Sequence, residues 1–428
     1  MSSNNILQLQ QPLTDGGIRS VNFFNGRLLT GNDLSREQAA RHEADNRLGL
    51  ALGEGVAYGL EVGLDPLRSK TGQPVVVIKP GLAVNRLGQI LSLGSEAYVG
   101  LTRSFAAELG PKCLFSDCKP LVGGTYVAGA GVYVLTIAPA EKLEGSAPSN
   151  SLNRASLNCN TDATVEAVQF RLLSLDRKYY SDLDFGATTF HNELAYRCFG
   201  EGVKSNWFGD LYGAAPRSDG LLDTLRNSVL SDADVPLALI YITGAIEVKF
   251  IDLWAVRRPL AARDAEGIFG SLVHPRRLAV GRAMFLQFKE HIDGLSKPNG
   301  DFGVITAQSH FRFLPPVGII PVMEETDLID TQATRFFTGM TYRSPAFINA
   351  ARVESLIRES LCYPPIDTQS GEMVWLYRVR ENRMAIDFAG SESGPRSYLV
   401  FASGHLPYIG NAQFDLAYWN YSNYALAR

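Results

Sequence analysis

The feature that most constrains this chain is a block of short motifs in fixed order between residues 22 and 84. It reads NFFNGRLLTGNDL at 22–34, then a helical stretch, then GEGVAYGLEV at 53–62 and KPGLAV at 79–84. Thr30 and Asp33 form a capping-box pattern, in which a hydroxyl and a carboxylate satisfy free N–H groups at a helix start. Gly53 and Gly55 end the predicted helix near residue 52. No residue of the block has the setting of a nucleophile, a metal ligand or a phosphate-binding loop. We therefore interpret the block as a structural joint.

The predicted first helix has a narrow apolar side made of Ala40, Ala44, Leu48 and Ala51. Small residues let another backbone come close, but they bury little area. We expect this helix to depend on neighbouring elements for its stability. The segment before it, residues 1–17, is polar and is predicted to be a flexible arm.

Alternating short apolar runs and turn residues predict much β-structure in the rest of the chain, and the 40 glycines and 21 prolines agree with many turns. Residues 56–93 are predicted to form a small β-meander. Strand-like runs at 131–138, 165–175, 237–243 and 246–256 form a second, sandwich-like β-region. Between them, residues 179–219 are predicted to be a long Gly- and aromatic-rich insertion.

Two further helices are predicted in the C-terminal part. Apolar residues from Leu278 to Leu295 recur at helical spacing after Pro275, and Gly294 and Pro298 end that pattern. A third helix is expected to start at Ser344 and to stop before residues 364–365, with strands following at 374–379, 384–388 and 398–402.

The predicted fold is thus α+β, rich in strands and divided into several domains. The expected units are an arm at 1–17, a helix-plus-meander domain at 18–100, a β-rich domain at 101–270 with its insertion, and a helix-plus-β domain at 271–428. A length of 428 residues fits more than one core.

Charge and cysteine content narrow the function classes. A net charge of −4 argues against a nucleic-acid-binding surface. The most apolar run, residues 235–248, is too short to cross a membrane and reads as paired strands. Five scattered cysteines and a polar N-terminus without a leader pattern predict a cytoplasmic protein in a reducing compartment.

Residues with the spacing of a catalytic or metal site are scarce. Cys113 and Cys118 are spaced Cys-x4-Cys without a second tight pair, so buried thiols, a disulfide and a metal site remain open, in that order. Ser403 and His405 lie on one strand, and His310 precedes a proline pair; neither pattern points to a base. No catalytic, metal-binding or cofactor-binding residue is assigned, and the chain is not expected to be an enzyme.

Exposed aromatic and charged residues supply candidates for protein contacts. Arg257 and Arg258 flank a predicted turn and are interpreted as surface charge, with pairing to acids of a neighbouring subunit as the alternative. The C-terminal aromatic cluster is predicted to be either an interface or part of the core. The candidate interface residues are Phe23, Phe24, Arg27, Glu37, Arg257, Arg258, Trp207, Tyr418, Trp419 and Tyr421.

The ordered motifs resemble a family encoded with phage-tail-like contractile injection systems. Beyond the first block, the resemblance rests on VPLAL at 235–239, IDLWAVRR at 251–258, FLPPVG at 313–318 and FASGHLPY at 401–408. The motifs are collinear from residue 22 to about 420. Asn85 and Arg86 depart from the small or acidic residues usual at that turn, and Ala57 replaces a bulkier residue.

The resemblance implies a structural or accessory subunit at or near the baseplate of such a particle, without catalytic residues or cofactors. Its expected partners are baseplate, sheath or tube proteins and copies of itself in a ring, built through two different surfaces. No nucleic acid partner and no direct membrane insertion are expected, so any membrane docking would pass through partner proteins.

Two other functions remain open. The chain is alternatively a carbohydrate- or cell-surface-binding module on such a particle, with sugar held by aromatic residues of the 179–207 insertion and the C-terminus. A hydrolase is the third reading, with Glu324, Glu325 and Asp327 as carboxylates on either side of a glycosidic bond.

Overall fold

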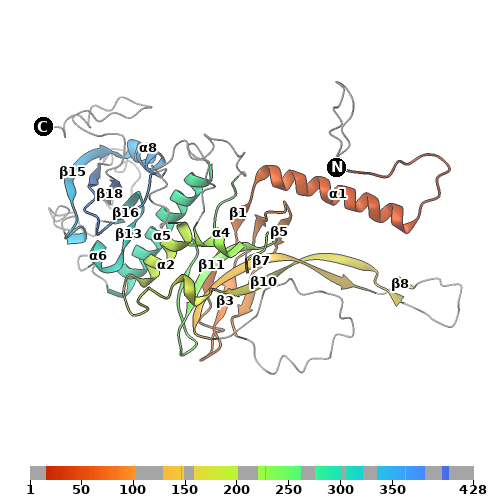
Figure 1. Cartoon of the computed structure of the whole chain (residues 1–428), viewed down its shortest axis with the longest axis horizontal. Coiled ribbons are helices and arrows are strands. Elements are labelled where there is room, and N and C mark those ends of the chain that lie inside the picture. The colour runs from red at the N-terminus through yellow and green to blue at the C-terminus, as the bar shows by residue number, and fades with distance from the viewer. Residues whose placement is uncertain are drawn as a thin grey trace, which may run out of the picture.

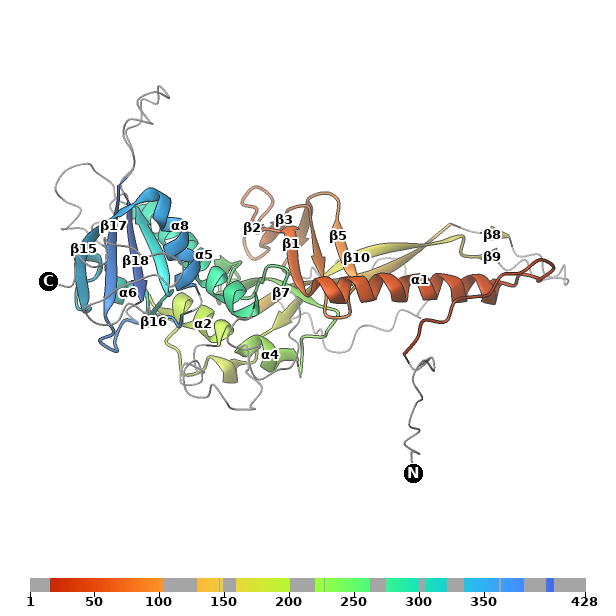
Figure 2. The ribbon, with the colours of Figure 1, turned by 90° about the horizontal axis from the view of Figure 1, so that it is seen from above.

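The computed structural model describes residues 16–102, 129–145, 147–148, 159–200, 220–226, 228–261, 275–299, 305–321, 335–361, 363–380 and 398–403. These residues form an elongated molecule with a body of small sheets and helices at one end (Figures 1 and 2). A long helix and a long β-hairpin project from the body in the same direction. The α+β, strand-rich fold class is confirmed.

The first helix, α1 (Gly31–Leu52), starts and ends where the sequence predicts. Thr30 is its N-cap, and the reciprocal hydrogen bonds of the capping box with Asp33 are both present. The helix buries only Ala40 and Gly49. It therefore draws little stability from an apolar face, and its attachment to the body is local.

The predicted single meander is wrong, because the region folds as two three-stranded sheets. The first has the order β1 (Gly55–Gly59), β4 (Gly81–Val84), β5 (Ile90–Leu93), and the second the order β2 (Val62–Leu64), β3 (Val75–Ile78), β6 (Ala97–Gly100). The chain changes sheet at Gly59 and Leu60, whose φ angles are +63° and +59°. A Cβ atom on Gly59 would lie 1.9 Å from the carbonyl oxygen of Pro80, where the chain crosses back. The two points at which the chain passes from one sheet to the other, at Gly59 and at Pro80, are in direct contact, so only glycine fits at position 59. We call this place the sheet crossing.

A four-stranded antiparallel sheet forms the centre of the body, in the order β10 (Ala163–Ser174), β7 (Gly131–Glu144), β11 (Val235–Ile242), β12 (Val248–Asp252). Side chains alternate between its two faces. Val132, Val134 and Leu239 pack into a core with the helices, whereas Leu135 and Ile137 pack into a second core with the two small sheets. The central sheet is thus a layer shared by two cores.

The insertion predicted at 179–219 is partly wrong, since many of its described residues, those of the helix at 190–199 above all, belong to the core. After a 3-10 turn, η2 (Arg177–Tyr179), the chain forms α2 (Phe190–Phe199), followed further on by α4 (Leu221–Arg226). The aromatic side chains of Phe190, Tyr196 and Phe199 are buried against the central sheet. Aromatic residues that looked suited to an open binding loop instead supply apolar area to this core.

Helix α5 (Pro275–Asn299) connects the body to a C-terminal unit, and it continues through Gly294, where the sequence suggested an end. The unit holds a sheet in the order β14 (Val317–Pro321), β18 (Tyr398–Ser403), β17 (Val374–Arg380), β15 (Tyr342–Asn349). Short elements α6 (Ala307–His310), β13 (Phe313–Leu314) and β16 (Ile366–Asp367) complete it. Its core is a cluster of aromatic rings contributed by Phe288, Phe311, Phe336, Phe337 and Phe401.

The predicted start of the third helix at Ser344 is wrong. Residues 344–345 lie in β15, and α8 (Ala350–Ser360) begins after that strand. The pairing of β15 with β17 shifts between Arg343 and Ala346, so Pro345 lies in a bulge, where its missing N–H costs no ladder hydrogen bond. The Pro that looked like a helix start is therefore a strand irregularity. The strands expected at 374–379 and 398–402 are confirmed as β17 and β18, while 384–388 lies outside the described residues.

Candidate functional site

The projecting part consists of α1 and of the extended segment before it, which packs along the helix. The backbone of residues 16–30 returns along α1, because Arg47 Nη2 donates to the carbonyl oxygen of Gly16 at 2.6 Å and Val21 N donates to Glu37 Oε2 at 3.1 Å. We call residues 16–52 the helical arm. Figure 2 shows it leaving the body beside the β7–β10 hairpin.

Two of the candidate interface residues hold the helical arm together. Arg27 donates to the carbonyl oxygen of Asn22 at 2.7 Å and to Asp33 Oδ1 at 2.6 Å. Hydrogen bonds from Thr30, followed by the bond from Arg27, lower the pKa of Asp33 and keep its carboxylate charged at the positive end of the helix. Glu37 likewise accepts an N–H of the arm. The contacts of Arg27 and Glu37 in this structure are internal, and a role toward other chains stays a prediction.

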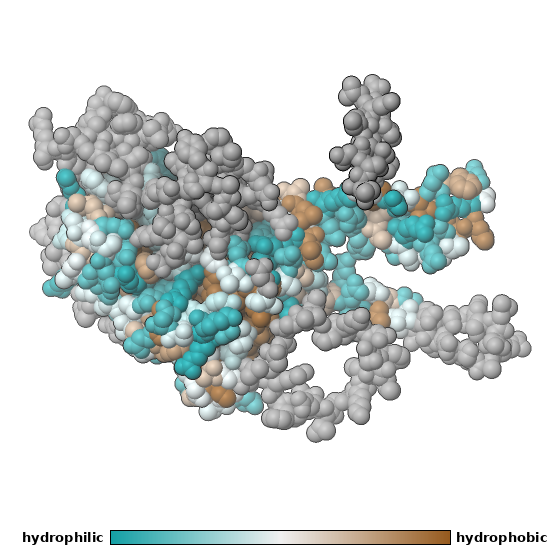
Figure 3. All heavy atoms as spheres, in the orientation of Figure 1, coloured by the Kyte–Doolittle hydropathy of each residue, from teal (hydrophilic) through white to brown (hydrophobic). Residues whose placement is uncertain are grey.

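Apolar side chains of the helical arm are exposed at both of its ends. At the outer end Phe23 is 51% and Phe24 63% exposed, and Leu28 is 86% exposed. Near the body, Leu48 is 66% and Leu52 58% exposed. Figure 3 shows these apolar patches separated by a polar middle section. Ordinary surfaces do carry single exposed apolar residues, but a run of them on a projecting element indicates a contact surface.

The base of the helical arm is fixed by a close contact between two backbones. Gly49 of α1 packs on Gly88 in the β4–β5 turn, so that a Cβ atom on Gly49 would lie 1.9 Å from the Gly88 carbonyl oxygen. The turn is itself anchored: Asn85 Oδ1 accepts from two backbone N–H groups of the turn, and its Nδ2 donates to Ala233 O. Asn85 therefore holds the turn against which this arm packs.

Arg86 adds a charged anchor at the same place. Its guanidinium donates to Glu54, just after the end of α1, and pairs with Asp223 of α4 at 3.4 Å. The side chain is 18% exposed, so these pairs are only partly screened by water. Burial raises the pKa of Asp223, against the lowering effect of Arg86 and Arg226. The Arg86 guanidinium thus connects the end of α1, the β4–β5 turn and the body through its ion pairs.

The β7–β10 hairpin is the second projecting element. Its inner part is buried, but the ladder continues outward from Pro139 paired with Val168 to Glu144 paired with Ala163. We call residues 139–144 and 163–168 the hairpin arm. It exposes Leu143 (63%) and Val165 (40%), and His42 of α1 lies 3.9 Å from its Glu166, both side chains exposed. The two arms approach each other there without a shared core. Small strands β8 (Ala147–Pro148) and β9 (Cys159–Asn160) lie at the outer end of the hairpin (Figure 1).

Arg257 is buried and Arg258 is half-buried, and both make contacts within the chain. Pairing of these residues with acids of a neighbouring subunit stays a prediction. Arg257 is 6% exposed and donates to the carbonyl oxygen of Gly59 in the sheet crossing. Arg258 donates to the carbonyl oxygens of Trp254, Ala255, Arg257 and Cys198, and its guanidinium lies over the ring of Phe199. Burial lowers the pKa of Arg258 to about 10. Both residues bind backbone oxygens inside the chain.

Several predicted residues lie outside the described part of the chain. They are Trp207, Tyr418, Trp419, Tyr421, Glu324, Glu325, Asp327, His405, Cys113 and Cys118. Within the described residues, no group of three His, Cys, Asp or Glu side chains is placed to hold a metal ion, and no helix has the length and apolar character needed to cross a membrane.

Sequence reasoning missed a buried polar cluster around His191 and Asp252. Asp252 belongs to the IDLWAVRR motif, but its partner lies 61 residues earlier on α2, and the pattern around His191 resembles any amphipathic helix. No local signal joins the two. They meet because α2 packs against the edge strand β12.

Comparisons with known proteins add little to this geometry. Neither a scan against protein-family models nor a search of curated proteins finds a match. Among solved structures, a crystal structure of TssK aligns with 39% of this chain and 36% of that chain, at 12% sequence identity and a TM-score of 0.20. At this TM-score the alignment does not indicate a shared fold.

Proposed function

We propose that this chain is a non-catalytic structural subunit of a phage-tail-like contractile injection system, located at or near the baseplate. The observation that carries the proposal is the pair of arms with exposed apolar ends, built on a rigid attachment to the body. A subunit of an assembly needs surfaces that reach its neighbours, and the two projecting arms provide such surfaces.

The positions of the family-like motifs support the same role. Residues 22–34 build the helical arm and its cap, residues 53–62 form the sheet crossing beneath it, and residues 251–258 supply the arginines that bind the crossing and α2. The motifs therefore specify how the arm is attached and aimed. The collinear motifs supply the particle context, with neighbouring baseplate, sheath or tube proteins and further copies of this chain as the partners.

The described aromatic residues do not favour the carbohydrate-binding alternative. Phe190, Tyr196 and Phe199 of the insertion are buried, so they offer no open face on which a sugar could stack.

A matched pair of substitutions tests the proposal. Leu28 on the helical arm is 86% exposed and Leu67 on the body is 92% exposed, so Leu28→Ser and Leu67→Ser remove the same group from equally open positions. If the arm docks on a neighbour, burying Leu28 contributes roughly 1.5–3 kcal/mol to that contact, about a 10- to 150-fold change in affinity. Sheath-containing particles purified from cells with each variant are compared for content of this chain by quantitative mass spectrometry.

We expect the Leu28→Ser particles to lose this chain and the Leu67→Ser particles to retain it. Electron microscopy of particles from a deletion strain should show missing density at the baseplate end. Intact, identical particles in the deletion strain, or equal retention of both variants, would contradict the assembly role.

A further inference from the structure

The helical arm presents an apolar patch at its outer end. There the extended segment turns into α1, and the ion pair of Arg27 with Asp33, at 2.6 Å, holds that turn. Five large apolar residues of this turn and of the first helical residues are each at least half exposed. We call them the tip patch: Phe23, Phe24, Leu28, Leu29 and Leu34.

A second apolar patch lies where the helical arm meets the body (Figure 3). Leu48 and Leu52 are four residues apart on α1, so they lie on one face of the helix. Gly49 packs on Gly88, which brings the β4–β5 turn against the same end of the helix. Leu87, in that turn, is 46% exposed.

The sheet beneath this turn extends the second patch. Tyr58 pairs with Leu82, and Ile90 pairs with Val84, two residues further along β4. Tyr58 and Ile90 therefore lie on the same face of the sheet, and they are 62% and 56% exposed. The opposite face packs into the core. We call the second set the base patch: Leu48, Leu52, Tyr58, Leu87 and Ile90.

One chain cannot cover its own base patch with its own tip patch. Leu34 and Leu52 are separated by 18 positions of one continuous helix, which corresponds to roughly 27 Å. The contact of Gly49 with Gly88 fixes the helix on the body, so the arm has no hinge at which to fold back. A partner for either patch must therefore come from another molecule.

The two patches have the size that a protein interface requires. Each exposes the equivalent of about three complete residues. At roughly 150–250 Å² for a large side chain, this corresponds to about 450–750 Å² of apolar surface per patch. A standard interface buries about 800 Å² on each partner, of which about 450 Å² is apolar. Either patch can thus supply the apolar part of an interface, and the two match each other in area.

The charges around the two patches are opposite in sign. Around the tip patch, at 22–36, two basic residues stand against one acidic residue: Arg27, Arg36 and Asp33. Around the base patch, at 45–61 and 85–92, three acidic residues stand against two basic ones: Asp45, Glu54, Glu61, Arg47 and Arg86. Contact of a tip with a base joins opposite net charges, whereas tip with tip or base with base joins like charges.

We infer that the tip patch of one copy docks on the base patch of a second copy in a head-to-tail contact. The inference rests on the proposed function and deepens it, because it names the partner of the helical arm and the surface that receives it. Each copy in such a contact keeps one unused patch, to which a further copy can bind. The contact therefore builds a ring if the rotation between copies closes, and an open chain if it does not.

Two variants that each lose one patch test the inference. The tip variant carries Phe24→Gln and Leu28→Gln, and the base variant carries Leu48→Gln and Leu52→Gln. All four positions are exposed, and glutamine has nearly the helix propensity of leucine. Leu64→Gln with Leu67→Gln is the matched control at exposed positions of the body. Analytical ultracentrifugation measures the mass of each purified full-length protein, alone and in equimolar mixture, at up to about 100 µM.

We expect the wild type and the control to form assemblies larger than a dimer. The tip variant and the base variant should each stay monomeric, since loss of two buried side chains weakens the contact by about 100-fold or more. Their equimolar mixture should give a dimer and nothing larger, because one intact tip meets one intact base. Formation of that dimer also shows that both variants are folded.

Other masses would overturn the inference. Dimers of the base variant alone would indicate contact between tips, and dimers of the tip variant alone would indicate contact between bases. A mixture that contains no dimer, or a wild type that is monomeric at about 100 µM, would contradict the contact itself. The proposed function fails on a different measurement, the retention of the Leu28→Ser and Leu67→Ser chains in purified particles, so the two failures are distinguishable.

Discussion

Substitution of Gly49 by alanine should release the helical arm from its fixed direction. A Cβ atom there would lie 1.9 Å from the Gly88 carbonyl oxygen, about 1.5 Å closer than an ordinary contact. The β4–β5 turn cannot yield easily, because Asn85 and Arg86 tie it to the body. The helix must move instead.

The displacement is amplified along the helix. Helix α1 has 22 residues and is about 33 Å long, and Gly49 lies close to its attached end at Leu52. A shift of about 1.5 Å at Gly49, pivoting about Leu52, tilts the helix by roughly 20° and moves its outer end by about 10 Å. Overpacking of this kind costs about 1–3 kcal/mol, offset by about 1 kcal/mol from replacing glycine within a helix.

Pulsed electron spin resonance measures this movement directly. Spin labels are carried by unnatural amino acids at the exposed positions Arg36 and Lys70, because native cysteines would also react with thiol labels. We expect Gly49→Ala to shift the distance distribution by several ångströms or to broaden it clearly. Gly31→Ala is the control, since no atom lies within 4 Å of its Cβ position in the same helix. A Gly49→Ala distribution that superimposes on that of the wild type would refute the reasoning.

Three further outcomes follow from the buried and capping groups. Thr30→Ala removes the N-cap hydroxyl and should cost about 1 kcal/mol of local helix stability, seen as faster hydrogen exchange in the first turn of α1 and unchanged exchange in α8. Asp234→Ala should lower the free energy of unfolding by about 3–5 kcal/mol in chemical denaturation, because Arg171, only 10% exposed, loses the carboxylate with which it forms an ion pair. The control, Glu144→Ala on the exposed hairpin arm, should cost under about 1 kcal/mol. The pKa of His291 is lowered in the folded state, so below about pH 6.5 the unfolded chain binds a proton that the folded chain does not. The free energy of unfolding should therefore fall as the pH drops below about 6.5, by up to about 1.4 kcal/mol per pH unit. His291→Asn should flatten that slope, and an unchanged slope would assign it to other groups.

The sequence by itself determined the elements whose signals are local. The capping box at Thr30 and Asp33, the glycine that ends α1, and the apolar runs of β3, β5, β17 and β18 each depend on residues a few positions apart. Backbone hydrogen bonds and side-chain caps act over that range, so a pattern of neighbours is enough to predict them. The strand-rich α+β class follows from the same local signals.

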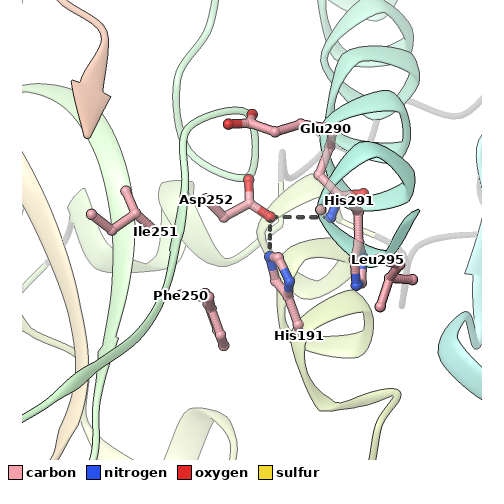
Figure 4. A pocket seen from close by; sticks show the side chains of 9 residues that line it. His191, Phe250, Ile251, Asp252, Glu290, His291 and Leu295 are labelled. Atoms are coloured by element: carbon pink, nitrogen blue, oxygen red, sulfur yellow. Dashed lines mark hydrogen bonds and ion pairs between the residues drawn. The ribbon is translucent and has the colours of Figure 1, made fainter. Parts of the chain in front are cut away.

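Tertiary structure decided what the local patterns left open. Pro345 reads as a helix start but lies in a bulge, because pairing with β17 outweighs its local preference. Arg257 and Arg258 read as surface charge, yet carbonyl oxygens brought together from distant segments hold them inside the chain. His191 and Asp252 lie 61 positions apart in the sequence and line the same pocket between α2, β12 and α5 (Figure 4), which the local pattern around neither residue predicts. Burial, charge pairing and pocket chemistry depend on which surfaces come together, and that information exists only after the chain has packed.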